Sequence, residues 1–161
     1  MIYILEGPDG SGKTTLANKL VEMIGGPYYH FSYPRSKEEA DQLYSAYYNK
    51  LVMLKYSDNS VIDRMWISTM VYGEILRGKS EVSTEQAKYL EHLIHRDAVI
   101  FYCTGDAETM WQRATRRGES YIKDFETFSK ICTLYDDIMY NQNHLIPVVT
   151  YDIEKGNNAV Y

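Results

Sequence analysis

The first 24 residues join a short apolar run, a glycine-rich turn and a helical pattern. The apolar run is I-Y-I-L at residues 2–5, the turn reads G-P-D-G-S-G-K-T at 7–14, and apolar residues recur at helical spacing from Leu16. A strand that passes through such a turn into a helix N-terminus wraps backbone N–H groups around phosphates. The pattern therefore predicts a strand–loop–helix unit that binds a nucleoside triphosphate.

The side chains of this loop suggest its chemistry. Glycines allow backbone conformations that a Cβ atom would forbid. Lys13 is expected to place its charge on the β- and γ-phosphates, and the Thr14 hydroxyl to bind Mg²⁺, the cofactor that this loop implies. The expected ATP-binding residues are Gly7, Gly10, Ser11, Gly12, Lys13, Thr14 and Thr15, with Arg113 from a later segment.

Composition narrows the class of protein. A chain of 161 residues, 45% hydrophobic and 24% charged, is typical of one globular domain over residues 1–161. The net charge of −5 argues against general affinity for nucleic acid, so DNA is an unexpected but not excluded partner. No apolar run approaches the ~20 residues of a membrane span, and we expect no membrane partner. Cys103 and Cys132 lack metal-ligand spacing and indicate reduced thiols, hence a cytoplasmic location.

Strand-like apolar runs alternate with amphipathic helical patterns along the chain. This alternation predicts an α/β three-layer sandwich in which about five parallel strands carry helices on both faces. Capping boxes at 36–39 and 83–86 mark two helix starts. After the first unit, strands are expected at 28–31, 61–63, 98–102 and 146–151, and helices from 36, over 66–76, from 83, over 106–115 and from 125.

Ligands of parallel sheets bind beyond the carboxyl ends of the strands, so residues that close a strand are functional candidates. Asp63 and Arg64 close one apolar strand. There a carboxylate could hold Mg²⁺, and a guanidinium could donate two parallel hydrogen bonds to a phosphate. Arg35 follows another strand. The alternative for Asp63 and Arg64 is a structural ion pair.

A second basic cluster comprises Arg113, Arg116 and Arg117, beside Gly118 and between two helices. Phosphoryl transfer needs positive charge on the moving group and exclusion of water, which a closing lid supplies. We expect a short lid over about residues 113–121. The alternative is a solvated helix end, where cations suit the helix dipole.

Several segments resemble thymidylate kinases, a family within the nucleoside monophosphate kinases. Residues 6–15 are similar to their E-G-x-D-G-x-G-K-T-T loop, and residues 63–72 resemble their D-R-Y-x-x-S-x-x-A-Y segment, with Met65 replacing the tyrosine. Residues 31–36 resemble their phenylalanine-proline turn with one inserted residue. The R-G-E within 113–119 resembles their lid. The resemblance covers most of the chain.

The resemblance implies a P-loop kinase that transfers the γ-phosphoryl of ATP to a deoxynucleoside monophosphate, dTMP or a related or modified pyrimidine, with Mg²⁺. It places Asp9 near the acceptor's sugar and phosphate, and Arg64 on that phosphate. Because Gly10 follows Asp9, catalytic charge is expected from lid residues Arg113 and Arg117. It also suggests a homodimer, in the host cytoplasm if the enzyme is phage-encoded.

The resemblance implies catalytic residues, acceptor-binding residues and metal ligands. Two of the acceptor-binding candidates, Trp66 and Tyr72, could equally be aromatic residues of the core. The expected catalytic residues are Lys13, Asp9, Arg64, Arg113 and Arg117; the acceptor site is Asp9, Arg35, Asp63, Arg64, Trp66 and Tyr72; and the metal ligands are Thr14 and Asp63.

The base of the acceptor stays open. Relatives place a thymine-reading arginine before the D-R segment, yet no arginine occurs between Arg35 and Arg64. One rival is a kinase for a hydroxyl of a deoxynucleoside or of a modified nucleotide in DNA, which would need a general base such as Asp9 or Asp63. Another is a P-loop switch protein, but the chain lacks the N-K-x-D motif that reads its base.

Overall fold

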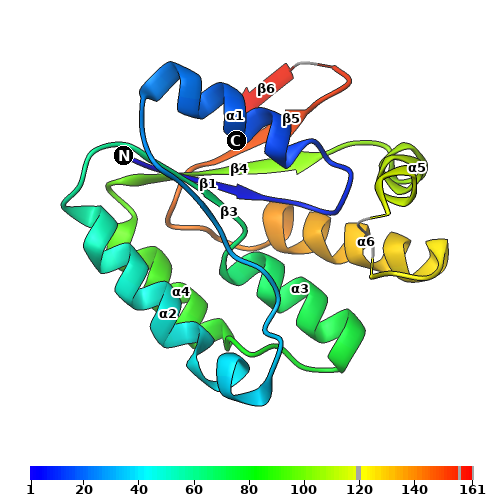
Figure 1. Cartoon of the computed structure of the whole chain (residues 1–161), viewed down its shortest axis with the longest axis horizontal. Coiled ribbons are helices and arrows are strands. Elements are labelled where there is room, and N and C mark those ends of the chain that lie inside the picture. The colour runs from blue at the N-terminus through cyan, green and yellow to red at the C-terminus, as the bar shows by residue number, and fades with distance from the viewer. Residues whose placement is uncertain (119–120, 156, 161) are drawn as a thin grey trace.

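The computed structural model describes residues 1–118, 121–155 and 157–160, and its strands form one sheet in the order β2-β3-β1-β4-β5-β6 (Figure 1). The first five strands are parallel, which confirms the predicted α/β sheet. The strands are β1 (Ile2–Glu6), β2 (Tyr28–His30), β3 (Ser60–Asp63), β4 (Ala98–Thr104), β5 (Val148–Asp152) and β6 (Asn157–Val160).

The sixth strand was not predicted. β6 pairs antiparallel with β5 at the edge of the sheet. Its sequence begins with two asparagines, a residue type depleted in strands, so neither propensity nor an apolar run marks it. Backbone pairing with a neighbouring strand decides its conformation.

Six helices connect the strands within the described residues. They are α1 (Lys13–Ile24), α2 (Lys37–Lys55), α3 (Trp66–Arg77), α4 (Thr84–Ile94), α5 (Ala107–Arg117) and α6 (Phe125–Asn141). The predicted capping box of α4 is complete, with Ser83 and Gln86 bonded reciprocally. At α2 only half forms, because the Glu39 carboxylate accepts from the Arg35 N–H instead. None of these helices has the length and hydropathy to cross a lipid bilayer.

The two faces of the sheet are covered unequally. On one face α1 packs Leu16, Ala17 and Leu20 against the strands. On the other face α2, α3, α4 and α6 build the larger core, below the sheet in Figure 1. Helices on both faces are thus confirmed, and most of the apolar burial lies on the second face.

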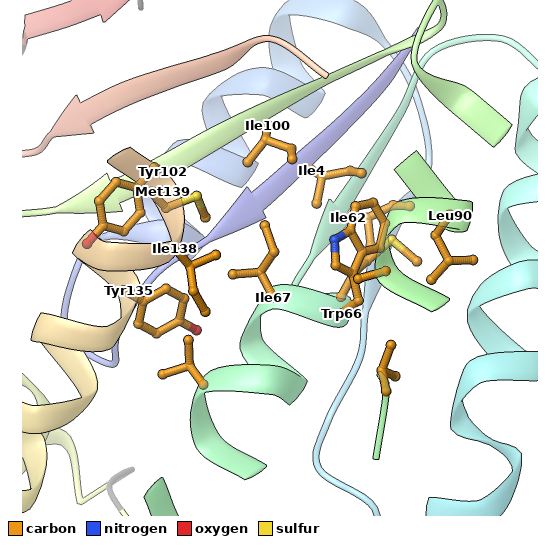
Figure 2. Close-up of a cluster of buried hydrophobic side chains, with 14 of the residues drawn as sticks. Ile4, Ile62, Trp66, Ile67, Leu90, Ile100, Tyr102, Tyr135, Ile138 and Met139 are labelled. Carbon is orange, nitrogen blue, oxygen red and sulfur yellow. The ribbon is translucent and has the colours of Figure 1, made fainter. Parts of the chain in front are cut away.

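Trp66 belongs to that larger core. Its side chain is 1% exposed, and Figure 2 shows it among the buried side chains of Ile62 and Leu90. The sequence alone left Trp66 open between acceptor contact and packing. The structure places it in the packing, because α3 begins at Trp66 with this residue turned toward the core.

Strand register brings the functional candidates together. Leu5 of β1 lies opposite Asp63 of β3, and His30 of β2 lies opposite Asp63 from the other side. The carboxyl ends of β2, β3 and β1 therefore meet at one edge of the sheet, where the glycine-rich loop begins.

Candidate active site

A cavity of about 830 Å³ lies at this edge of the sheet. Its volume is in the range of small-ligand sites. It is lined by loop residues Asp9, Gly10, Gly12, Lys13 and Thr14; by Tyr28, His30, Ser32, Tyr33, Pro34 and Arg35; by Asp63, Arg64, Leu76 and Arg77; and by Arg117 and Tyr121. The predicted nucleotide loop and the predicted acceptor side thus share one cavity.

The glycine-rich loop is wedged against neighbouring backbone. At Gly7 a Cβ atom would collide with the carbonyl oxygen of Cys103, and at Gly10 with that of Met110. Both glycines also have positive φ, 146° and 76°. These positions therefore require glycine for conformation and for space. Of the other predicted ATP-binding residues, Ser11 is buried and Thr15 is exposed at the start of α1.

The Lys13 side chain binds back to the backbone of the glycine-rich loop that precedes it. Its Nζ donates to the carbonyl oxygens of Gly7 (2.8 Å) and Pro8 (2.6 Å) and contacts Ser11 Oγ at 3.3 Å. Burial, together with the positive charge of Arg64, lowers the pKa of Lys13 to about 8. The ammonium group is thus held against the backbone of the loop that the sequence pattern predicts to bind the triphosphate.

Arg64 is buried beneath the loop, 8% exposed. Its guanidinium donates through Nη1 to the Gly7 carbonyl at 3.1 Å, and through Nη2 to the Asp9 carboxylate. It lies 5.3 Å from the centroid of the Tyr72 ring. Arg64 is also the one non-glycine residue with positive φ (70°) in the described chain. Such a conformation costs on the order of 1 kcal/mol or more, and such residues cluster at functional sites.

Asp63 keeps one carboxylate oxygen free. Its Oδ2 accepts from the Tyr28 hydroxyl (2.9 Å) and lies 3.3 Å from His30 Nδ1. Burial alone would raise the pKa of Asp63, but His30, Lys13, Arg64 and Tyr28 outweigh it and hold the pKa below its usual value. Its Oδ1 is buried and has no hydrogen-bond partner among the described residues.

This arrangement fits a magnesium ion. Mg²⁺ prefers carboxylate and hydroxyl oxygens and is usually held by only one or two protein ligands plus substrate phosphates. Asp63, whose buried Oδ1 has no partner among the described residues, and the exposed Thr14 both line the cavity. They are the two residues that the sequence suggested as metal ligands.

Glu6 is a buried structural residue behind the site to which the sequence assigned no role. It is fully buried, and its carboxylate accepts from the backbone N–H groups of Met65 (2.9 Å) and Ser68 (3.1 Å) and from the Ser68 hydroxyl. Burial raises its pKa above the usual value despite these bonds. The N-cap residue of α3 supplies no side-chain cap. Glu6 thus caps α3 from β1 and fixes the segment that carries Arg64.

Of the other predicted acceptor residues, Arg35 and Tyr72 differ in whether they reach the surface of the cavity. Arg35 lines the cavity directly. Tyr72 lies beneath the lining: it is 1% exposed, and its hydroxyl accepts from the Asp9 N–H at 3.2 Å. Tyr28, His30, Tyr33 and Arg77 also line the cavity, although the sequence did not assign them to the acceptor site. His30 closes β2, so the rule for strand ends could have indicated it, whereas Arg77 reaches the cavity only through the tertiary structure.

The predicted lid is partly helical. Arg113, Arg116 and Arg117 form the last turns of α5, which ends at Gly118 with φ 65°. Arg117 lines the cavity, whereas Arg113 pairs with Glu154 at 3.2 Å. Glu119 and Ser120 of the predicted lid lie outside the described residues.

Known proteins are similar to this chain in sequence and in fold. No protein-family model matches the chain. The chain is 30% identical over 141 residues to the SPbeta prophage-derived uncharacterized protein YorR of Bacillus subtilis (strain 168), covering 87% of this chain and 82% of that protein. It is 34% identical over 100 residues to the "Putative thymidylate kinase" of Acidianus bottle-shaped virus (isolate Italy/Pozzuoli), covering 60% of this chain and 63% of that protein.

Two solved structures have folds similar to that of this chain. The crystal structure of Bacillus subtilis YorR in complex with phosphorylated GDP superposes with a TM-score of 0.76 at 28% identity, over 94% of this chain and 85% of that chain. Deoxyadenosine kinase from M. mycoides with bound dATP shares the fold, with a TM-score of 0.66 at 19% identity over 96% of this chain and 92% of that chain. The fold is shared with a nucleoside kinase, and the chain belongs to the YorR family.

Proposed function

We propose that this enzyme transfers the γ-phosphoryl group of ATP to the phosphate of a deoxynucleoside monophosphate, and that Mg²⁺ accompanies ATP. One observation carries the proposal. Beyond the loop, the cavity is lined by the cations Arg35, Arg64 and Arg117, while Asp9 pairs with Arg64 and the one unpaired carboxylate oxygen, Asp63 Oδ1, would be taken by Mg²⁺. An anionic acceptor needs such positive charge, whereas a hydroxyl acceptor needs a free base.

The residues of the chain would divide the work by position. Lys13 and the loop N–H groups would hold the β- and γ-phosphates, and Arg64 would hold the acceptor phosphate in line with them. Arg117 would add positive charge at the transferred group. Thr14 and Asp63 would hold Mg²⁺, which neutralises charge on the phosphate oxygens when bound.

A hydroxyl acceptor is the second candidate, and one contact favours it. His30 lies 3.3 Å from Asp63 and lines the cavity, so this pair could take a proton from a hydroxyl of a deoxynucleoside or of a nucleotide in DNA. The phosphate acceptor remains the better fit, because the Asp63 oxygen facing His30 also accepts from Tyr28.

Relatives leave the base of the acceptor undecided. The resemblance and the name of the viral relative favour dTMP or a related pyrimidine, whereas the YorR crystal structure contains phosphorylated GDP. Both relatives nevertheless support a nucleotide ligand in this fold.

The test is ADP release from ATP and Mg²⁺ across deoxynucleoside monophosphates, deoxynucleosides and oligonucleotides. Only monophosphates should stimulate release, and Lys13→Ala should abolish it, while Lys19→Ala on the exposed face of α1 should not. Stimulation by nucleosides or oligonucleotides but not by monophosphates would overturn the proposal. Equal hydrolysis with and without any acceptor would do the same.

A further inference from the structure

Tyr33, Leu76, Arg77 and Tyr121 line the cavity but have no role in the proposed phosphoryl transfer. The Tyr33 ring lies against Tyr121, with 6.2 Å between the ring centroids. A chain of ring contacts links these residues to the phosphate end: Arg64 lies 5.3 Å from the Tyr72 ring centroid, Tyr72 lies 4.9 Å from the Tyr33 ring, and Arg77 lies 5.8 Å over Tyr33. Two tyrosine rings thus separate Arg77 from Arg64.

This separation suits the two ends of a nucleotide. If Arg64 holds the acceptor phosphate, the base would extend along the tyrosines toward Arg77. Leu76 and Tyr121 are 40% and 79% exposed there, and they offer apolar surface for the face of a planar ring. Arg77 is then the charged group available at the edge of the base.

The Arg77 guanidinium is already oriented. Its Nε donates to one carboxylate oxygen of Glu81 at 2.6 Å, and its Nη2 donates to the other at 2.9 Å. A guanidinium has five N–H donors in one plane. This side-on pair therefore leaves a second fork, one N–H on Nη1 beside one on Nη2. No described residue accepts a hydrogen bond from Nη1.

The segment after α3 fixes Glu81 in place. It folds back over Gly73, where a Cβ atom would come within 2.8 Å of the Lys79 carbonyl oxygen. Ser80 bonds twice to the backbone of Val82, which is 1% exposed in the core. The Glu81 side chain is itself only 12% exposed. A carboxylate held in this way limits the rotamers of Arg77 before a ligand arrives.

We propose that Arg77 reads the base of the acceptor and selects one with two adjacent hydrogen-bond acceptors. This inference rests on the proposed function. Guanine presents N7 and O6 side by side, the pair to which arginine commonly donates twice. Cytosine presents N3 and O2. Thymine places an N–H donor next to its O4, and adenine places an amino donor next to its N7, so neither matches the free fork.

The test compares kcat/KM for dGMP, dCMP, dTMP and dAMP in the wild type, Arg77→Met and Arg96→Met. Arg96 is exposed and outside the cavity lining, so its variant controls for loss of a surface charge. A bidentate pair discriminates between bases by on the order of 10- to 100-fold. The wild type should favour dGMP or dCMP over dTMP and dAMP by this factor, Arg96→Met should keep the preference, and Arg77→Met should lose it through KM.

Base analogues then distinguish the two sources of the acceptor pair. If guanine is read, dIMP, which keeps N7 and O6, should replace dGMP, whereas 7-deaza-dGMP should lose the preference. If cytosine is read, dCMP should be preferred over dUMP. Glu81→Gln should weaken discrimination while leaving the melting temperature near that of the wild type.

Two results would overturn the inference: preference for dTMP or dAMP in the wild type, or a preference for dGMP or dCMP that survives Arg77→Met. Failure of the proposed function would look different, because no monophosphate would then stimulate ADP release at all.

Discussion

Arg64 joins a strand end, a loop and two helices through one side chain. Its guanidinium contacts the Gly7 carbonyl, Asp9, Ser68 and the Tyr135 hydroxyl. These contacts hold it at the cavity, with its charge beside the glycine-rich loop. A residue so placed can position the loop and bind an anion.

Arg64→Ala should therefore raise the KM for the acceptor at least about tenfold, the scale of a lost hydrogen bond to a charged group, with a smaller change in the KM for ATP. Steady-state kinetics with each substrate varied in turn measure both values. Arg64→Lys retains the charge but not the fork and should lie between the two. Equal changes in both KM values would show that Arg64 does not hold the acceptor phosphate.

His144 provides a separate prediction for stability. Its two ring nitrogens lie 2.8 Å from Glu91 and 2.9 Å from the Ile138 carbonyl oxygen. Burial alone would lower the pKa of His144, but these two acceptors outweigh burial and raise it. The doubly protonated ring is therefore favoured in the folded protein. Its stabilising contribution is complete below the unfolded pKa of about 6.5 and is lost as the pH rises through the folded pKa.

Urea unfolding at pH 6 and pH 9 checks this sign. The difference in unfolding free energy between wild type and His144→Gln should be larger at pH 6. A wild-type advantage that grows toward pH 9 would contradict the assignment.

At the scale of elements, the start of α3 depends on a residue from another strand. The buried Glu6 carboxylate of β1 accepts from two N–H groups at the beginning of α3, the place where a helix favours negative charge. Glu6, the carboxylate before the glycine-rich loop, therefore stabilises the start of α3 close to the site.

Glu6→Gln should lower the free energy of unfolding by about 1–3 kcal/mol, because an amide nitrogen would replace one acceptor and leave a buried N–H without a partner. Chemical denaturation measures this change. Glu22→Gln, on the exposed face of α1, provides the matched control and should be close to neutral. A Glu6→Gln protein as stable as the wild type would show that the cap contributes little.

Among these elements, the sequence could predict the site residues that follow apolar strands, but not those placed by tertiary packing. The glycine-rich loop and the Asp63–Arg64 pair were identified because each follows an apolar strand, and parallel strands gather their ends at one edge. Tyr28 and Arg77 follow no such rule. Tyr28 reaches Asp63 from a neighbouring strand, and Arg77 reaches the cavity only because the next segment folds back over Gly73. These placements depend on tertiary packing rather than on local pattern.

At the scale of the whole molecule, the parallel sheet gathers the charges of one active site from distant segments. The carboxyl ends of β1, β2 and β3 supply the loop, Asp63 and Arg64, while α3 and α5 add Arg77 and Arg117. Arg35, Arg64 and Arg117 line a cavity that also holds the glycine-rich loop, and this positive charge favours a reaction between two phosphates. The aromatic wall beyond them leaves room for a base.

The most direct measurement follows the transferred group itself. ATP radiolabelled in its γ-phosphoryl group is incubated with the enzyme, Mg²⁺ and deoxynucleoside monophosphates, and the products are separated and identified. We expect the label in the β-phosphate of a deoxynucleoside diphosphate, with one ADP formed for each label transferred. Label recovered instead as a phosphate ester on a sugar hydroxyl, or only as inorganic phosphate, would contradict transfer between phosphates.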